Sequence, residues 1–151
     1  MNNLQAKYIY SSALFVAHEP IILNTILGSC VAVCLWDSER ATGGMNHYML
    51  PLWNGEGFAS PKYGNIANEL LVKKMLAQGS NMENLIAKFF GGAQMLDDNA
   101  RIFDIGQRNT ELAFEIYAAY GIEIAKGSTG GNRGRKIFFN THTGEVMQKY
   151  L

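Results

Sequence analysis

Cys30 lies between a Gly-Ser pair and an apolar run, in the stretch TILGSCVAVCLW at positions 25 to 36. Gly28 and Ser29 allow a sharp turn that would leave the thiol at a strand end, where backbone N–H groups can face an oxyanion. A thiol becomes nucleophilic at neutral pH when a partner lowers its pKa of about 8.5, and an imidazole does this by taking the proton. The alternative is a small core hydrophobe, as most free cysteines are and as Cys34 is expected to be.

Three histidines are available as partners of this thiol. His18 and His142 lie in stretches typical of solvated turns. His47, in GGMNHYMLP, follows the segment after Cys30, so a hairpin would bring both toward the same open end. With the turn centred near Ala41, Cys30 lies eleven residues before and His47 six after, so the pairing requires a bulge or bend. A core histidine that donates to a carbonyl is an equally good interpretation of His47.

The two cysteines also allow a metal site to be considered. Their four-residue spacing within a predicted strand separates Cys30 and Cys34 too widely for an ordinary disulfide, so both are expected to be free thiols. Together with His47 they offer three potential zinc ligands. A structural zinc site needs four ligands, and the customary CxxC spacing is missing, which makes a zinc-binding module the weaker hypothesis.

The elements that must position these residues follow from apolar patterning. Extended segments are predicted at 31–36, 45–50, 84–93, 122–126, 136–140 and 145–150, the last two as an antiparallel hairpin. Helices are predicted from about 66 to 76, capped by Gly79, and from 109 to 120, with Asn109 as N-cap and Gly121 after it. Strands and helices interleave, which favours an α/β (α+β) layered sandwich with mixed sheets and two main helices.

Composition narrows the class of protein. A chain of 151 residues with no linker or repeat is expected to form a single domain over 1–151. Thirteen basic and thirteen acidic side chains leave no net charge, which argues against nucleic acid or an anionic membrane as partner. The apolar runs are too short to insert in a bilayer, and no signal-peptide pattern is present, so a cytoplasmic protein is expected.

Two segments close in sequence, LGSCVAVCLWD and GGMNHYMLP, resemble the paired signature of the CheD family, the chemoreceptor glutamine deamidases of bacterial chemotaxis. Further blocks follow in the family's order, from about Leu27 to Val146: KYGNIANELLVKKM, AKFFGGAQM, IGQRN and STGGNRGRKIFFNTHTGEV. The resemblance implies an α/β sandwich related to the catalytic domain of the cytotoxic necrotizing factor toxins. It also implies a Cys-His-Thr site without metal or organic cofactor, with Cys30 as nucleophile and His47 as base.

The third member of that site is open between two residues. The family's threonine lies six places before the cysteine, where this chain has Asn24, and Thr25 lies one place nearer. Either Thr25 takes the role, or Asn24 orients the imidazole through its amide, as in papain-like proteases. We expect Thr25. Both residues can also simply belong to a strand edge.

The resemblance implies a reaction and partners. The Cys30 thiolate would attack the carboxamide of a glutamine on a chemoreceptor's cytoplasmic helical hairpin, release ammonia and leave a thioester that water hydrolyses to glutamate. Methyl-glutamate esters share the acyl intermediate, so methylesterase activity is implied as well. A CheC-type phosphatase is an implied partner, and a non-catalytic adaptor that binds such a phosphatase is the alternative function. The arginines of STGGNRGRK, at 128–136, would either meet acidic receptor surface or form a solvated flank.

Overall fold

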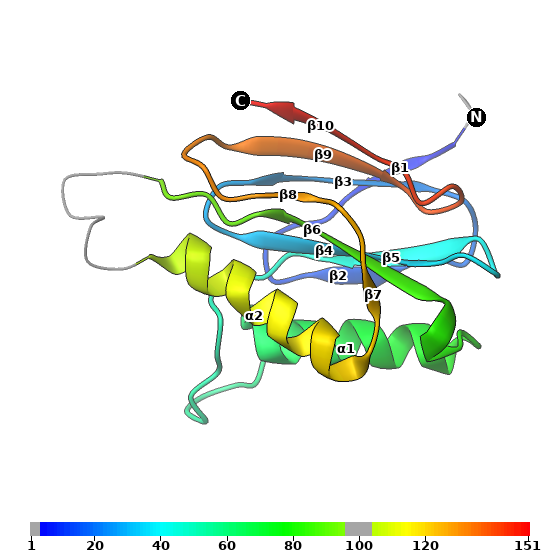
Figure 1. Ribbon diagram of the computed structural model, residues 1–151, viewed down its shortest axis with the longest axis horizontal. Helices are drawn as coiled ribbons and strands as arrows, with labels where there is room; N and C mark the ends of the chain where they lie inside the picture. Colours follow the sequence, from blue (N-terminus) through cyan, green and yellow to red (C-terminus); the bar gives the residue numbers. More distant parts are fainter. Residues whose placement is uncertain (1–3, 96–103) are drawn as a thin grey trace.

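The computed structural model describes residues 4–95 and 104–151, which form two facing β-sheets and two helices against the outer side of one sheet (Figure 1). Three layers result, in the order sheet, sheet, helices. The predicted layered α+β sandwich with mixed sheets and two main helices is confirmed.

The outer layer, sheet A, has the strand order β1-β3-β9-β10. Its strands are β1 (Ala6–Tyr8), β3 (Ile22–Leu27), β9 (Arg135–Asn140) and β10 (Val146–Tyr150). The predicted C-terminal hairpin is confirmed as the antiparallel pair β9–β10, whereas β1 runs parallel to β3. No bounds are predicted from the sequence for β1, which has only three residues and is too short to show a period, and β3 is anticipated only as a strand edge at Asn24 and Thr25.

The central layer, sheet B, has the order β2-β5-β4-β6-β7, with β8 also paired to β6. Its strands are β2 (Leu14–Val16), β5 (Thr42–Asn46), β4 (Val31–Asp37), β6 (Leu85–Gly91), β7 (Glu123–Ile124) and β8 (Ser128–Thr129). The predicted central strand is β4, which is covered on both faces. Val31, Val33 and Leu35 pack in the core beside the helices, while Ala32 and Cys34 pack in the core between the sheets.

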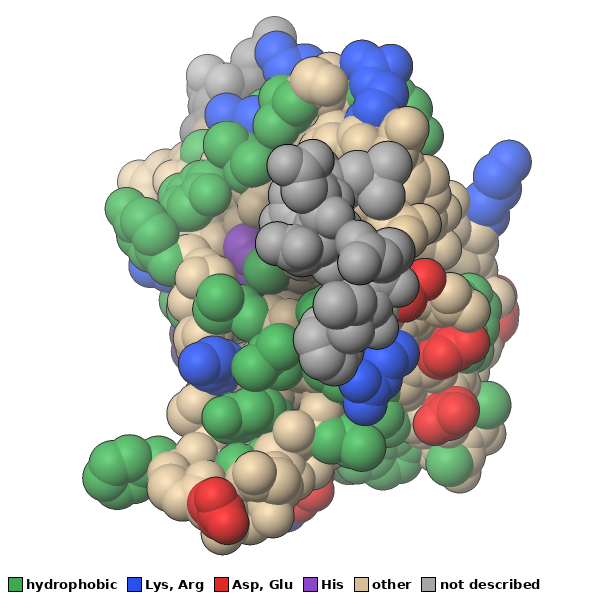
Figure 2. All heavy atoms as spheres, turned by 90° about the vertical axis from the view of Figure 1, so that its left-hand side faces the viewer, with side chains coloured by type: hydrophobic (Ala, Val, Ile, Leu, Met, Phe, Trp, Pro, Cys, Tyr) green, Lys and Arg blue, Asp and Glu red, His purple; other side chains and the backbone are tan. Residues whose placement is uncertain are grey.

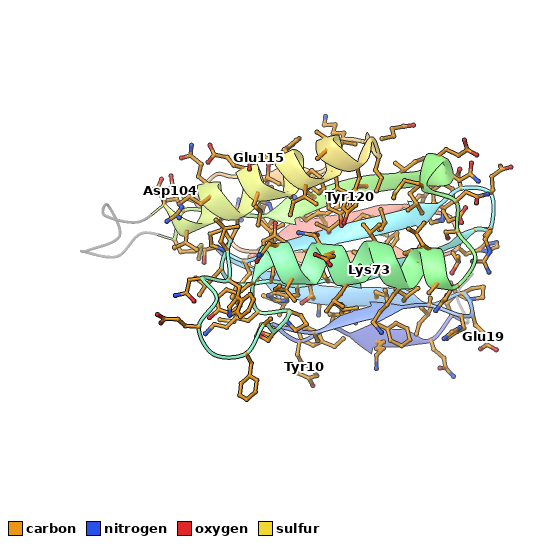
Figure 3. All side chains as sticks on the ribbon, turned by 90° about the horizontal axis from the view of Figure 1, so that it is seen from below. Tyr10, Glu19, Lys73, Asp104, Glu115 and Tyr120 are labelled. Atoms are coloured by element: carbon orange, nitrogen blue, oxygen red, sulfur yellow. The ribbon has the colours of Figure 1, made fainter. Side chains whose placement is uncertain are left out.

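Helix α1 (Gly64–Ala77) and helix α2 (Ile105–Tyr120) lie side by side across sheet B (Figure 3), and a short 3-10 turn, η1 (Met82–Asn84), precedes β6. Gly79 and Gly121 adopt the left-handed conformation after each helix, as predicted. No helix in the two described stretches is long and apolar enough to cross a membrane.

The predicted N-cap of the second helix is wrong. Helix α2 begins one turn earlier, where the side chain of Asp104 accepts a hydrogen bond of 3.0 Å from the backbone N–H of Gln107. Gly106 in the first turn weakens the helical pattern in the sequence. Glycine is needed there because a Cβ would collide with the carbonyl oxygen of Ala93. Asn109 is therefore an interior helical residue, and its side chain is free for another role.

A buried polar network joins both helices to sheet B. The Asn46 side chain accepts from the backbone N–H of Val33 at 3.0 Å and donates to Asn68 Oδ1 at 2.9 Å. The hydroxyl of Tyr117 donates to the same oxygen at 2.9 Å, and Asn68 Nδ2 donates to the carbonyl of Gly64 at 2.9 Å. Asn68 thus links three elements, and its removal would leave buried groups unpaired.

We predict that Asn68→Ala lowers the free energy of unfolding by about 2–4 kcal/mol, because the Asn46 amide and the Tyr117 hydroxyl would each lose their acceptor. Urea denaturation measures this change. Lys73→Ala is the control on the same helix, since Lys73 lies on the outer face of α1 in an exposed pair with Glu69 (Figure 3) and should matter by less than about 1 kcal/mol. Equal effects of the two substitutions would contradict the network's importance.

Candidate active site

The turn from β3 to β4, which carries Cys30, and the segment after β5, which carries His47, lie at the same end of the sandwich (Figure 1). Figure 2 faces this end and shows hydrophobic side chains gathered around a histidine. Loops at this end carry several large exposed apolar side chains: Tyr10, Leu52, Phe58 and Met95. The shared end that the hairpin argument predicted for Cys30 and His47 is present.

The β4–β5 ladder sets where Cys30 and His47 lie relative to each other. It runs from the pair Asp37 and Thr42 to the pair Cys34 and Met45, and the same register returns in the bridge between Val31 and Tyr48. This register places His47 opposite Ala32, and Cys30 precedes Ala32 by two residues on the same face. Cys30 and His47 are thus diagonal neighbours across a strand pair, a separation that side chains can span.

The predicted bulge in this hairpin is wrong, because the pairing contains no extra residue. The turn is centred between Glu39 and Arg40 rather than at Ala41. The stretch from Cys30 to the turn and the stretch from the turn to His47 are therefore much closer to equal in length. Asp37 Oδ1 fixes this turn by accepting from the backbone N–H groups of Glu39 and Arg40 at 2.9 and 3.0 Å. Asp37, as an aspartate at the start of a turn, is the sequence signal that places the turn at residues 37 to 42.

Strand β3 brings Thr25 toward His47 from the opposite sheet. Leu23, Thr25 and Leu27 alternate into the space between the sheets, and Thr25 is fully buried there. Asn24 points to the other side, where its Nδ2 donates to the carbonyl of Lys7 at 3.2 Å. Of the two candidates for the third site residue, the structure places Thr25 beside the imidazole.

The hydrogen bonds of Thr25 determine the tautomer of His47. Thr25 Oγ1 lies 2.8 Å from His47 Nδ1 and 2.6 Å from the carbonyl oxygen of Ile9. A carbonyl oxygen only accepts, so the single hydroxyl hydrogen of Thr25 goes to Ile9. The Nδ1–H of His47 must then donate to Oγ1, which leaves Nε2 of the neutral ring with a free lone pair.

The main chain of His47 is held separately from its ring. Its N–H donates to the carbonyl of Ala13 at 3.2 Å, and its carbonyl accepts from the N–H of Ser12 at 2.8 Å. These bonds continue the β2–β5 pairing past the end of both strands. Hydrogen bonds therefore hold His47 both at its main chain and at Nδ1 of its ring.

Burial sets the charge state of the candidate pair. Cys30 is half-buried, and the loss of solvent raises the pKa of its thiol, although hydrogen bonding with its own backbone N–H opposes this. Burial also lowers the pKa of His47, against a smaller opposing contribution from the backbone of Ile9. At neutral pH the two groups therefore rest as a thiol and a neutral imidazole rather than as an ion pair.

Two backbone N–H groups lie beside the thiol. Those of Ser29 and Cys30 donate to no oxygen within residues 4–95 and 104–151. On the other side of the turn, the carbonyl of Gly28 accepts from Ala93 N–H at 3.0 Å, and that of Cys30 accepts from Gly92 N–H at 2.8 Å. Free N–H groups of this kind can stabilise a developing oxyanion.

The remaining candidates lie outside this cluster. Cys34 is buried, and burial raises its pKa far above the ordinary range, as expected for a core residue. Both cysteines are free thiols. His18 and His142 are exposed, as predicted. Among the described residues, no group of three or more His, Cys, Asp or Glu side chains is arranged to hold a metal ion.

For two buried side chains near the site, the structure differs from what the sequence predicted. Arg135 is not a solvated or receptor-facing arginine, because only 2% of it is exposed and it donates to the carbonyls of Gly91 and Gly130 at 3.3 and 2.7 Å. Asn109, expected as a helix cap, instead donates to the carbonyls of Ser29 and Met49. The bonds of Arg135 to Gly91 and of Asn109 to Ser29 and Met49 join segments far apart in sequence, so no local pattern could reveal them.

Comparison with known proteins places the chain among chemotaxis proteins. Residues 49–150 match a family model described as CheD chemotactic sensory transduction. A protein of Sulfurimonas denitrificans, named probable chemoreceptor glutamine deamidase CheD, is 49% identical over 97% of this chain and 95% of its own length. Relatives of the same name from Trichlorobacter lovleyi and Acidiphilium cryptum are 49% and 45% identical, over 95% and 90% of this chain and 89% and 73% of their own lengths. On its fold, its family match and these relatives, the chain belongs to the CheD family.

Proposed function

We propose that this protein is a chemoreceptor glutamine deamidase in which Cys30 is the nucleophile, His47 the general base and Thr25 the residue that orients His47. The observation that carries the proposal is the pair of hydrogen bonds at Thr25 Oγ1, which donates to the carbonyl of Ile9 and accepts from His47 Nδ1. This arrangement leaves His47 Nε2 unprotonated on the face that Cys30 shares. The names of the relatives support the substrate class.

The first half of the reaction forms a thioester. As Cys30 Sγ bonds to the carboxamide carbon of the glutamine, its proton moves to His47 Nε2, because the neutral ring holds a lone pair there. The carboxamide oxygen becomes an oxyanion, which the free N–H groups of Ser29 and Cys30 stabilise. The C–N bond then breaks as His47 returns the proton to the departing nitrogen, and ammonia leaves.

The second half regenerates the thiol. His47 Nε2 takes a proton from water while the water oxygen bonds to the thioester carbon, again with an oxyanion facing the same N–H groups. The S–C bond breaks, the proton goes to Cys30 Sγ, and the side chain departs as glutamate. A methyl-glutamate ester enters the same cycle with methanol as the leaving group, so methylesterase activity belongs to the proposal.

The surface around the site fits a protein substrate. Leu52 and Phe58 lie on the loop between β5 and α1, and they expose 56% and 93% of their surface. Apolar side chains on loops at the mouth of a site are typical of surfaces that bind another protein. We therefore assign this face to the receptor's cytoplasmic helical hairpin, and we expect a CheC-type phosphatase to compete for it.

We predict that Cys30→Ala abolishes deamidation, with a loss of at least about a thousand-fold, because no other group at the site can form the thioester. The mass gain that accompanies each Gln-to-Glu conversion in a receptor fragment measures the rate. Cys34→Ala is the matched control, since that buried thiol should affect stability and leave the rate within a few-fold.

A Cys30→Ala protein that converts glutamine as fast as its parent would rule out this nucleophile. A parent that converts no glutamine in any receptor fragment, yet retains a CheC-type phosphatase in pull-down, would favour the adaptor function instead.

Thr25→Val should lower kcat about a hundred-fold, because the ring loses the acceptor that holds its orientation and tautomer. Thr25→Ser keeps the hydroxyl and should restore most of the rate. Asn24→Ala serves as control, since Asn24 contacts Lys7 on the other face of β3. The assignment fails if Asn24→Ala is the more damaging of the two neighbouring changes.

The pKa shifts predict how the site depends on pH. Since burial lowers the pKa of His47, the neutral base persists to more acidic conditions, and the acid limb of kcat/KM should have its midpoint below about pH 6.5. Since burial raises the pKa of Cys30, its alkylation by iodoacetamide should keep accelerating from pH 7 to beyond pH 9. A plateau in alkylation below about pH 7 would show a standing thiolate and contradict the neutral pair.

A further inference from the structure

Asn109, in the second turn of α2, is completely buried and reaches the turn that carries Cys30. Its Nδ2 donates two hydrogen bonds of 3.0 Å, one to the carbonyl of Ser29 and one to the carbonyl of Met49. Its own backbone carbonyl accepts from the hydroxyl of Tyr48 at 2.6 Å. One helical residue thereby holds the segment before Cys30 and the segment after His47.

The strand ladder does not supply a donor to Ser29. The β4–β5 register ends in the bridge between Val31 and Tyr48, and the next paired residues would be Ser29 and Leu50. The N–H of Leu50 instead donates to the carbonyl of Lys62 at 3.1 Å. Asn109 Nδ2 therefore takes the place of the missing strand donor.

The orientation of the Asn109 amide is unambiguous. Both of its acceptors are carbonyl oxygens, so the atom facing them must be the NH₂ group, which alone in this side chain can donate twice. Asn109 Oδ1 is buried and accepts no hydrogen bond from the described part of the chain.

We propose that Asn109 is a positioning residue for the deamidation reaction: it holds the peptide group between Ser29 and Cys30 so that the N–H of Cys30 faces the oxyanion. This inference rests on the proposed function. The carbonyl of Ser29 and the N–H of Cys30 belong to one planar trans peptide, so they point in opposite directions. A donor that fixes the carbonyl on the α2 side fixes the N–H on the other side.

The neighbouring carbonyls of the same turn are fixed in the same way. Ala93 N–H holds the carbonyl of Gly28, and Gly92 N–H holds that of Cys30. Backbone N–H groups donate to the carbonyls of Gly28 and Cys30, whereas the carbonyl of Ser29 between them accepts from a side chain. Asn109 is therefore the position at which a single substitution can release the Cys30 N–H without cutting the main-chain contacts of the turn.

The test compares Asn109→Ala and Asn109→Asp with the parent in three measurements. Loss of an oxyanion donor lowers kcat by about 10²–10³-fold, so kcat for receptor deamidation should fall by about that factor, with KM changed less than about three-fold. Alkylation of Cys30 by iodoacetamide displaces iodide and forms no oxyanion, so its rate should stay within about three-fold of the parent's. The acid limb of kcat/KM should not move.

Tyr117→Phe is the matched control. It removes a buried hydrogen bond from the same helix, to Asn68, without touching the Cys30 turn, so it should lower stability and leave kcat unchanged. An unchanged kcat in Asn109→Ala with an active parent overturns the inference and leaves the proposed function intact. Equal losses in kcat and alkylation also overturn it, because they would indicate general disorder of the site. A parent without deamidase activity refutes the proposed function itself.

The parent protein provides a measurement that does not depend on whether a variant folds. A receptor peptide with an aldehyde in place of the glutamine carboxamide should add Cys30 Sγ to its carbonyl carbon, with the thiol proton transferred to form a thiohemiacetal. In a crystal structure of that adduct, the former carbonyl oxygen should accept from the N–H of Cys30, with Asn109 still bound to the Ser29 carbonyl. An oxygen directed away from this N–H would overturn the proposal.

Discussion

The hydroxyl of Thr25 has one hydrogen, and its donation to the carbonyl of Ile9 decides which ring nitrogen of His47 carries a proton. Because that hydrogen is committed, the oxygen can only accept from His47 Nδ1, and the other ring nitrogen is left as a base. The bond between Thr25 and His47 also joins sheet A to the segment that follows β5 of sheet B, so the tautomer of the imidazole depends on how the two sheets are packed. A slip of one residue in β3 would turn Thr25 outward and remove the oxygen that accepts from the ring.

The sandwich gathers residues that no single segment could bring together. Sheet A contributes the hydroxyl, the end of the β4–β5 hairpin contributes the thiol and the imidazole, and α2 contributes the amide of Asn109 that grips the Cys30 turn. The buried network around Asn68 holds the helices on the hairpin's other face. The same sheets and helices therefore contain both the side chains that stabilise the fold and those that form the site, but the two sets of side chains differ.

The sequence predicted the parts of this arrangement that local patterns encode. A glycine-serine turn, a continuous apolar run and a second extended segment were enough to place Cys30 and His47 at one end of a hairpin. The alternation in β3 favours Thr25 over Asn24 as the residue beside His47, because Thr25 shares its strand face with the apolar Leu23 and Leu27. Asn109 could not be identified, because its two acceptors lie 80 and 60 positions away along the chain, and nothing near it in sequence reports on them.

The resting state of the thiol has a consequence for how long the protein survives in an oxidising environment. Peroxide attacks a cysteine in its thiolate form and reacts poorly with the protonated sulfur. Burial raises the pKa of Cys30 and so disfavours its thiolate form. The same desolvation that disfavours an ion pair with His47 thereby also disfavours the first step of oxidation of this sulfur, to sulfenic acid.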